Sequence, residues 1–162
     1  MKTFEELKEE LLNRAKNANA CQNGYKMGLD AKNKADLLKA ITANWFWVLI
    51  DARIVDAIYL EENFTEEELS EAGIYTRKCH EVRAVSFACG SATVKAYGSA
   101  TVEACDSATV EAYDSATVEA YDESYVEDCT GNIRPRYDYA IVKDYHNHKI
   151  YIRKGKFEII EV

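Results

Sequence analysis

The chain has 162 residues, of which 48% are hydrophobic and 30% charged, and its formal net charge is −8. This composition is typical of a soluble globular protein with one compact domain or two small ones. No stretch approaches 18 consecutive apolar residues, so a transmembrane helix is not expected. The start of the chain, MKTFEELKEELL, lacks the apolar region of a signal peptide, and we therefore expect a cytoplasmic protein.

The negative charge is concentrated in the middle of the chain. Residues 83–130 carry two basic and nine acidic side chains, whereas residues 131–162 carry seven basic and four acidic ones. An acidic body disfavours direct binding to DNA, RNA or an anionic membrane, because binding to those surfaces requires positive charge. We therefore expect no direct nucleic-acid partner and no membrane partner.

The amino-terminal segment, residues 1–80, predicts a small helical module. Its first helix begins at a capping box formed by Thr3 and Glu6. It is expected to run to about Ala18 and to be closed by the segment up to Gly24, with Gly24 as the carboxyl-terminal cap. Residues 25–34 are expected to form a short helical turn and a linker.

A second helix is expected to begin near residues 33–36. Its apolar residues follow helical spacing: Leu37, Ile41, Trp45, Val48 and Ala52. The run WFWVLI is also compatible with a buried strand, but its flanks favour a helix. Trp45 and Trp47 are expected in the core rather than in a ligand pocket, although their spacing leaves one of them off the main stripe. A second capping box at Thr65 predicts a further helix.

Residues 91–122 repeat almost letter for letter every eight residues, as SATVKAYG, SATVEACD, SATVEAYD and SATVEAYD. Apolar residues at positions 2, 4 and 6 alternate with polar ones, which is the period of a β-strand. The Asp-Ser and Gly-Ser junctions are typical of turns. Because one such strand cannot bury its apolar face alone, we predict a β-solenoid of stacked octads. The thin core is compatible with two or with three octads per coil, that is, 16 or 24 residues.

The octad frame extends over residues 83–146 with increasing departures from the repeat, including GNIRPRYD at 131–138, where Pro135 is expected to break the pattern. Position 7 of this frame is always tyrosine or cysteine: Cys89, Tyr97, Cys105, Tyr113, Tyr121, Cys129, Tyr137 and Tyr145. By parity, we expect this column to lie outside or at a corner, as one ladder with a spacing of roughly 4.8 Å.

Beyond the repeat, three strands are predicted at residues 139–145, 149–152 and 157–160, with a hairpin turn at 153–156 between the last two. A stacked repeat needs atypical ends that cover its open strands. The predicted fold class is therefore α+β, in three parts: a helical module or amino-terminal cap over 1–80, an octapeptide β-solenoid over 81–146 and a β-hairpin cap over 147–162.

Cysteine and histidine offer two candidate sites, both disfavoured. The five cysteines are expected to be reduced thiols. A 16-residue coil would stack Cys89 on Cys105, whereas a 24-residue coil would stack Cys105 on Cys129, so a redox staple is the alternative interpretation. His146 and His148 would share a strand face, but spacing supplies no third metal ligand. We expect no metal and no cofactor.

Motifs of catalysis are missing from the sequence. It has no glycine-rich phosphate loop, no Gly-x-Ser-x-Gly elbow and no paired-carboxylate motif. The cysteines alternate with tyrosine in one column, which indicates packing rather than nucleophilic chemistry. We therefore expect a protein that is not an enzyme.

Two further features resemble a known class of proteins. The pattern Asn19-Ala-Cys21 with Gly24, followed by Asn44-Trp45-Phe-Trp47, and the Ala-Thr-Val-Glu-Ala-Tyr octads resemble phage and prophage accessory proteins. The resemblance covers most of the chain. It implies a mobile-element accessory protein, a class that includes inhibitors of host defence such as anti-CRISPR and anti-restriction proteins.

The acidic columns are the candidate binding site. We expect one face that carries carboxylates beside tyrosines: Glu103, Asp106, Glu111, Asp114, Glu119 and Asp122, with Tyr97, Tyr113 and Tyr121. About two carboxylates per roughly 4.8 Å of rise would approach the charge density of duplex DNA, which has about one charge per 1.7 Å. Such a ladder could act as a DNA mimic that binds a basic nucleic-acid-binding protein of the host.

Three alternatives remain open. The acidic residues could serve only to keep a repetitive β surface soluble and its edges unpaired. The solenoid could be a structural or assembly protein, used as a spacer or as the contact surface of a homo-oligomer. A threonine ladder at position 3, which could order water or carbohydrate, is less favoured because Glu and Tyr interrupt that face.

Overall fold

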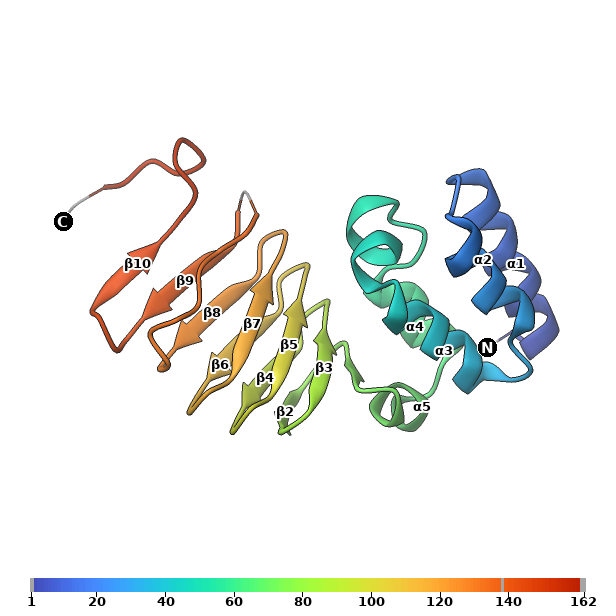
Figure 1. Ribbon diagram of the computed structural model, residues 1–162, viewed down its shortest axis with the longest axis horizontal. Coiled ribbons are helices and arrows are strands. Elements are labelled where there is room, and N and C mark those ends of the chain that lie inside the picture. Colours follow the sequence, from blue (N-terminus) through green and yellow to red (C-terminus); the bar gives the residue numbers. More distant parts are fainter. Residues whose placement is uncertain (1, 138, 161–162) are drawn as a thin grey trace. The chain divides into compact units, whose positions relative to one another are not determined.

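The computed structural model describes residues 2–137 and 139–160. The chain divides into two compact units, residues 1–74 and 75–162. The first unit is helical and the second is a β-solenoid with a terminal hairpin, so the predicted α+β fold is confirmed (Figure 1). No helix in the described part of the chain is both long enough and apolar enough to cross a bilayer.

Two helices of the first unit begin where the sequence predicted. Helix α1 (Phe4–Asn17) opens with the Thr3 capping box, in which the Glu6 backbone N–H donates to Thr3 Oγ1 at 3.3 Å. Helix α5 (Glu66–Glu71) opens in the same way at Thr65. A capping box satisfies backbone groups that have no partner inside the helix, so short sequence signals determine both starts.

The predicted cap at Gly24 is wrong. The first helix ends at Asn17, close to the predicted Ala18, but Gly24 lies inside a separate helix, α2 (Gln22–Asp30). Cys21 caps α2, because its Sγ accepts the Gly24 N–H at 3.4 Å. The residue types do not predict this helix, since glycine is a poor helix former and cysteine is not among the preferred caps.

The second predicted helix is divided into two segments. Helix α3 (Lys34–Ala43) is followed by a π-helical segment, η1 (Phe46–Asp51), in which the Ala52 N–H donates to the Trp47 carbonyl at 2.8 Å. The strand interpretation of this run is therefore excluded. Helix α4 (Ala57–Asn63) then leads to α5.

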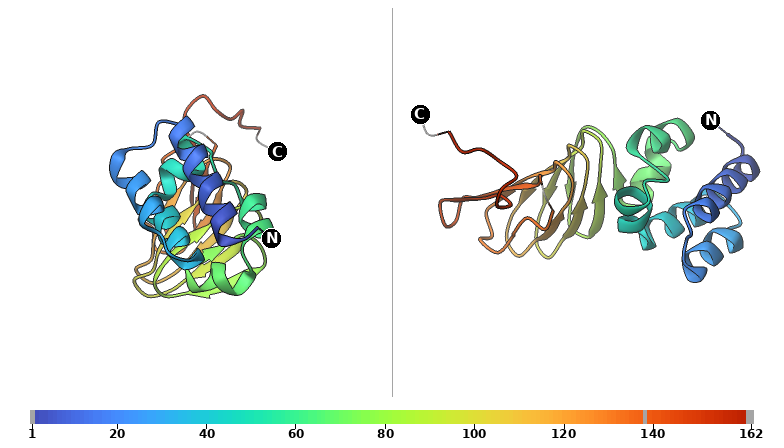
Figure 2. Two further views of the ribbon diagram at one scale, coloured as in Figure 1. Left: turned by 90° about the vertical axis from the view of Figure 1, so that its right-hand side faces the viewer. Right: turned by 90° about the horizontal axis from the view of Figure 1, so that it is seen from above.

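The second unit contains two sheets that face each other across a narrow core (Figures 1 and 2). Sheet A has the order β1-β3-β5-β7 and comprises β1 (Ile74–Tyr75), β3 (Val85–Ala88), β5 (Thr101–Ala104) and β7 (Thr117–Ala120). Sheet B has the order β10-β9-β8-β6-β4-β2 and comprises β2 (Cys79–Val82), β4 (Thr93–Ala96), β6 (Thr109–Ala112), β8 (Tyr125–Asp128), β9 (Ile141–Asp144) and β10 (Lys149–Tyr151).

Consecutive octads lie on opposite sheets, so that one coil contains 16 residues. In sheet B, Thr93 pairs with Thr109, which in turn pairs with Tyr125. In sheet A, Thr101 pairs with Thr117. This parallel register excludes the 24-residue coil.

The core between the sheets consists of small aliphatic side chains from octad positions 2, 4 and 6, as the alternation predicted. These residues have no exposed area: Ala92, Val94, Ala96, Ala100, Val102, Ala104, Ala108, Val110 and Ala112. Full burial of one valine side chain contributes about 1.5–3 kcal/mol. Because every coil repeats the same packing against its neighbours, these contributions accumulate along the stack.

Position 8 of the octad has a left-handed backbone at each corner. The φ angle is +62° at Gly90, +63° at Gly98, +53° at Asp106, +56° at Asp114 and +49° at Asp122. Aspartate tolerates this region because its short polar side chain forms local hydrogen bonds. Oδ2 of Asp106 accepts the Gly90 N–H at 3.0 Å, and Oδ2 of Asp114 accepts the Gly98 N–H at 2.9 Å. These aspartates therefore link successive coils.

Residues 131–137 depart from the octad pattern, whereas Ala140 again occupies a core position. None of the described residues in this segment belongs to a strand, and sheet A ends at β7, so the predicted octad there is wrong. Pro135 lacks the N–H that a ladder bond requires. The register nevertheless continues in sheet B, where Tyr125 pairs with Ile141. The loop thus occupies half a coil, and its Ile133 joins the core.

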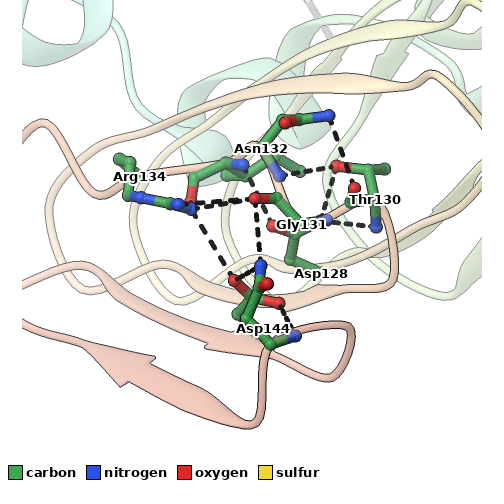
Figure 3. Close-up of polar contacts among 8 residues, drawn as sticks. Asp128, Thr130, Gly131, Asn132, Arg134 and Asp144 are labelled. Atoms are coloured by element: carbon green, nitrogen blue, oxygen red, sulfur yellow. Dashed lines mark hydrogen bonds and ion pairs between the residues drawn. The ribbon is translucent and has the colours of Figure 1, made fainter.

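Two buried aspartates organise this loop (Figure 3). Asp128 and Asp144 stand at position 6, where earlier coils have alanine. Oδ1 of Asp128 accepts the Thr130 and Gly131 N–H groups at 2.7 and 3.0 Å, and its Oδ2 accepts the Ile133 N–H at 3.0 Å. A buried carboxylate requires such donors, so the change from alanine to aspartate marks the end of the repeat.

Asp144 joins the loop to the turn that follows β9. Its oxygens accept the backbone N–H and the side-chain amide of Asn147 at 2.8 and 2.9 Å, and Arg134 lies 3.8 Å away. Burial raises the pKa of Asp144, but the Asn147 hydrogen bonds and the Arg134 charge outweigh it, so the net pKa is lowered. The ionised carboxylate therefore stabilises the cap, and this contribution is lost as the pH falls through the lowered pKa.

A terminal hairpin is present, but its strands differ from the predicted pair. It consists of β9 and β10, in which Lys149 pairs with Asp144. Residues 157–160 were predicted as a strand but form none. Ile159 and Ile160 are exposed, and their apolar pattern does not create a strand because it finds no pairing partner in the described chain.

The left-handed corners lead to a prediction about Asp114. Replacement by alanine and by glycine both remove the carboxylate that accepts the Gly98 N–H, but only glycine adopts positive φ without strain. We expect Asp114→Ala to have a free energy of unfolding about 1 kcal/mol lower than Asp114→Gly, as measured by urea denaturation. Equal stability of the two variants would show that the corner conformation is not a constraint.

Candidate functional site

The 16-residue coil separates the predicted acidic residues onto two sides of the solenoid. Four lie on or directly after strands of sheet A: Glu103, Asp106, Glu119 and Asp122. Two lie on or directly after β6 of sheet B: Glu111 and Asp114. The expectation of a single acidic face is therefore wrong, because adjacent octads point to opposite sides.

We call the sheet A group, extended by the exposed Glu123, the acidic edge. It carries Glu103 and Asp106 on one coil, and Glu119, Asp122 and Glu123 on the next. Glu119 pairs with Arg136 at 2.9 Å. Burial and, to a smaller extent, the charge of Glu119 raise the pKa of Glu103, so like charges on successive coils repel.

The outward column on sheet B carries mixed charge. Each residue of this column pairs with the next one on the adjacent strand, in the order Glu81, Lys95, Glu111, Glu127 and Lys143. Lys95 Nζ lies 3.2 Å from Glu111. The hydrogen bond from Tyr113 and, to a smaller extent, Lys95 lower the pKa of Glu111. Sheet B therefore presents paired charges and does not extend the acidic edge.

The tyrosine and cysteine column is also divided, so the prediction of one ladder is wrong. The corner after sheet A contains Cys89, Cys105, Tyr121 and Tyr137, and the corner after sheet B contains Tyr97, Tyr113, Cys129 and Tyr145. Half-buried Tyr97 and Tyr113 stack at 5.0 Å with 10° between their ring planes. Tyr121 is only 4% exposed and donates its hydroxyl to Glu119. Its predicted role as a surface contact is wrong, because position 7 is buried at this corner.

Cys89 and Cys105 are buried free thiols on successive coils. The hydrogen bond with Cys89, followed by burial, raises the pKa of Cys105. Because the thiolate is both the nucleophile and the metal ligand, this thiol is poorly suited to either role. The ligand atoms of Cys105, Asp106 and Asp122 lie within 4.8 Å of one another, but Asp106 already accepts the Gly90 N–H.

His146 and His148 do not lie on a strand, contrary to the prediction. Both are exposed in the turn between β9 and β10, and His148 has a φ of +54°. The strand ends earlier because Asp144 begins the hydrogen-bonded turn with Asn147. This geometry removes the argument that both imidazoles share one strand face.

The helical unit contains an apolar cavity that the sequence did not predict. Trp45 is buried in the core, as expected, whereas Trp47 lines the cavity. Gly24 and Gly28 line it from α2, and their spacing of four residues was the available signal. That signal was missed because α2 itself was not predicted as a full helix.

No protein-family model, curated protein or solved structure matches this chain. The placement of the side chains is therefore the structural basis for any functional proposal.

The opposite pKa shifts of Glu103 and Glu111 lead to a prediction. Because its pKa is raised, ionised Glu103 disfavours the folded state, and this cost grows as the pH rises from the unfolded-state pKa to the raised folded-state pKa. Replacement of Glu103 by glutamine is expected to increase the free energy of unfolding at pH 7 by less than about 1 kcal/mol. Urea denaturation should show that the gain disappears near about pH 3, where both states are protonated.

Replacement of Glu111 by glutamine is the matched control on sheet B. Its pKa is lowered, so the ionised form stabilises the fold above the unfolded-state pKa, and this contribution is lost as the pH falls through the lowered pKa. This variant should lose stability at pH 7, again by less than about 1 kcal/mol. Changes of the same sign at pH 7 would contradict the assignment of the two glutamates to different environments.

Proposed function

We propose that this protein is a non-enzymatic inhibitor or decoy that binds a basic, nucleic-acid-handling protein through its acidic edge. The observation that supports the proposal best is the gathering of five carboxylates onto two successive coils at one side of sheet A. A basic surface that normally receives phosphates would find a comparable array of negative charge there.

The spacing of the charges supports this interpretation. Successive coils lie about 4.8 Å apart, and two carboxylates per coil give about one negative charge per 2.4 Å. Duplex DNA has about one charge per 1.7 Å of its axis, so the two densities are similar. The acidic edge covers only two coils, and it therefore matches a short phosphate stretch rather than a long duplex.

The acidic edge is also held rigidly by the solenoid. Glu103 and Glu119 project from strands in parallel register over a core of alanine and valine, and the corner residue Asp106 is fixed by the Gly90 N–H. A preorganised surface loses little conformational entropy when it binds. The resemblance to phage accessory proteins suggests a partner in host defence, of the kind that anti-CRISPR or anti-restriction proteins inhibit.

A second candidate, an assembly protein, is favoured by the end of sheet B. Strand β10 is the terminal strand of this sheet, and its Ile150 is 66% exposed. A terminal strand with an exposed apolar side chain can pair with a strand of another chain. In this alternative the solenoid would be a spacer or a homo-oligomer contact.

Capture from a bacterial host lysate by the tagged full chain tests the acidic edge. We expect one or more basic proteins to be captured, to be released by duplex DNA, and to bind less as salt rises from about 50 to 500 mM. The combined variant Glu103→Gln, Glu119→Gln and Glu123→Gln should reduce capture at least tenfold, because it removes three of the five charges of the edge.

The matched control removes the same number of charges from sheet B, through Glu81→Gln, Glu111→Gln and Glu127→Gln. We expect this variant to retain its partners. Equal loss in both variants, or capture that is insensitive to salt and to DNA, would contradict the proposal. A homo-oligomer that is seen by light scattering and abolished by Ile150→Lys on β10 would favour the assembly function instead.

A further inference from the structure

The helical unit contains a cavity of about 330 Å³, which has no role in the function proposed above. Its wall is formed by α1, α2, α3, η1 and the segment after η1, and it includes Leu12, Ala15, Ala40, Ile41, Trp47 and Ile54. The cavity opens to solvent on one side, where Asn19 and Cys21 of its wall are exposed. This volume lies within the range of small-molecule sites, about 300–1,000 Å³.

Helix α2 forms one wall without filling the space. None of its side chains is fully buried, and it contributes Gly24, Tyr25 and Gly28 to the wall. A Cβ on Gly28 would lie 3.3 Å from Leu12 Cδ2, and a Cβ on Gly24 would lie 3.0 Å from Asn44 Oδ1. The two glycines therefore let the α2 backbone approach α1 and Asn44 closely while they add no side-chain volume to the cavity.

The opposite wall contains the π-helical segment. Trp47 and Val48 of η1 both line the cavity, and the wider turn brings the Ala52 N–H to the Trp47 carbonyl. π-helical turns cost stability relative to an α-helix and occur frequently at functional sites. The cavity is thus bounded by two departures from regular helix packing, a glycine-containing helix and a π-helix.

The chemistry of the wall specifies the occupant. No charged side chain lines the cavity among the described residues, and most of the wall is aliphatic or aromatic. The polar groups are neutral: Asn19, Cys21, Tyr25 and Asn44. The Asn44 amide donates to the Ala40 carbonyl at 2.8 Å, which directs its Oδ1 toward Gly24. A charged ligand would be desolvated there without a counter-ion, whereas a hydroxyl or N–H group could donate to Asn44 Oδ1.

We infer that this cavity binds a small, uncharged, apolar molecule that carries one hydroxyl or N–H donor. The apolar part replaces water along the wall formed by Ile41, Trp47 and Ile54, and the donor pairs with Asn44. The site therefore distinguishes a neutral molecule from a charged one with the same carbon skeleton. The chain combines this small-molecule site with a protein-binding edge on its solenoid.

The test compares 1-octanol with octanoate on the purified full chain by ligand-detected NMR and calorimetry. We expect 1-octanol to bind in a 1:1 ratio and octanoate to bind at least tenfold more weakly, because the carboxylate has no partner in the wall. Failure of 1-octanol to bind up to its solubility limit, or equal affinity for both molecules, would overturn the inference.

Two variants locate the binding site. Ala40→Leu fills part of the cavity and should weaken octanol binding at least tenfold. Ala35→Leu adds the same atoms at an exposed position of the same helix, outside the wall, and should leave the affinity unchanged. Circular dichroism checks that each variant is folded. If Ala40→Leu fails to fold, the octanol affinity of Asn44→Ala is measured instead. Unchanged octanol affinity in the folded Ala40→Leu variant, or in Asn44→Ala if it is needed, would overturn the inference.

Discussion

The structure depends on one constraint, the closure of each coil after two octads. A strand of four residues and a corner of four residues carry the chain to the opposite sheet, so that alanine and valine face each other across the core. The corners close because glycine or aspartate occupies the left-handed backbone position. Every surface property follows from this closure, since it decides which side chains share a face.

Much of the solenoid could be predicted from the sequence because alternation with a period of two is a local property. The buried alanine and valine positions and the turn residues were correct for that reason. The number of octads per coil was not predictable, because a thin core accommodates either two or three. The single acidic face and the exposed Tyr121 were wrong for this reason alone, since both assumed that successive octads present the same side.

Other differences arise where tertiary contacts override local preference. Residues 131–137 belong to no strand, because the start of this segment follows the hydrogen bonds of Asp128 rather than a sheet. Helix α2 contains two glycines and forms because it packs on α1 and α3, which residue propensity does not reveal. Residues 157–160 differ in the other direction: their apolar pattern favours a strand, but they form none because no described strand pairs with them.

The two sheets of the solenoid differ in the charge that they present to solvent. Sheet B combines Lys95 with Glu111 in an ion pair and therefore presents balanced charge, whereas the acidic edge of sheet A concentrates carboxylates, and burial together with the smaller effect of the Glu119 charge raises the pKa of Glu103 there. The stability cost of this raised pKa is expected where a surface is adapted to binding rather than to stability alone. Closure of each coil after two octads therefore limits the core to small residues and also places the candidate binding residues on one side of sheet A.

The most direct test of the coil length is a comparison of engineered disulfides on the surface. Thr101 and Thr117 are neighbours in sheet A, with their hydroxyl oxygens 3.1 Å apart, whereas Thr93 and Thr117 would be neighbours only in a 24-residue coil. In a chain whose native cysteines are replaced by alanine, Thr101→Cys with Thr117→Cys should form a disulfide on mild oxidation, and Thr93→Cys with Thr117→Cys should not. Cleavage after glutamate and mass spectrometry identify the linked peptides. Efficient linkage of residues 93 and 117, without linkage of 101 and 117, would contradict the two-octad coil and the division of faces that follows from it.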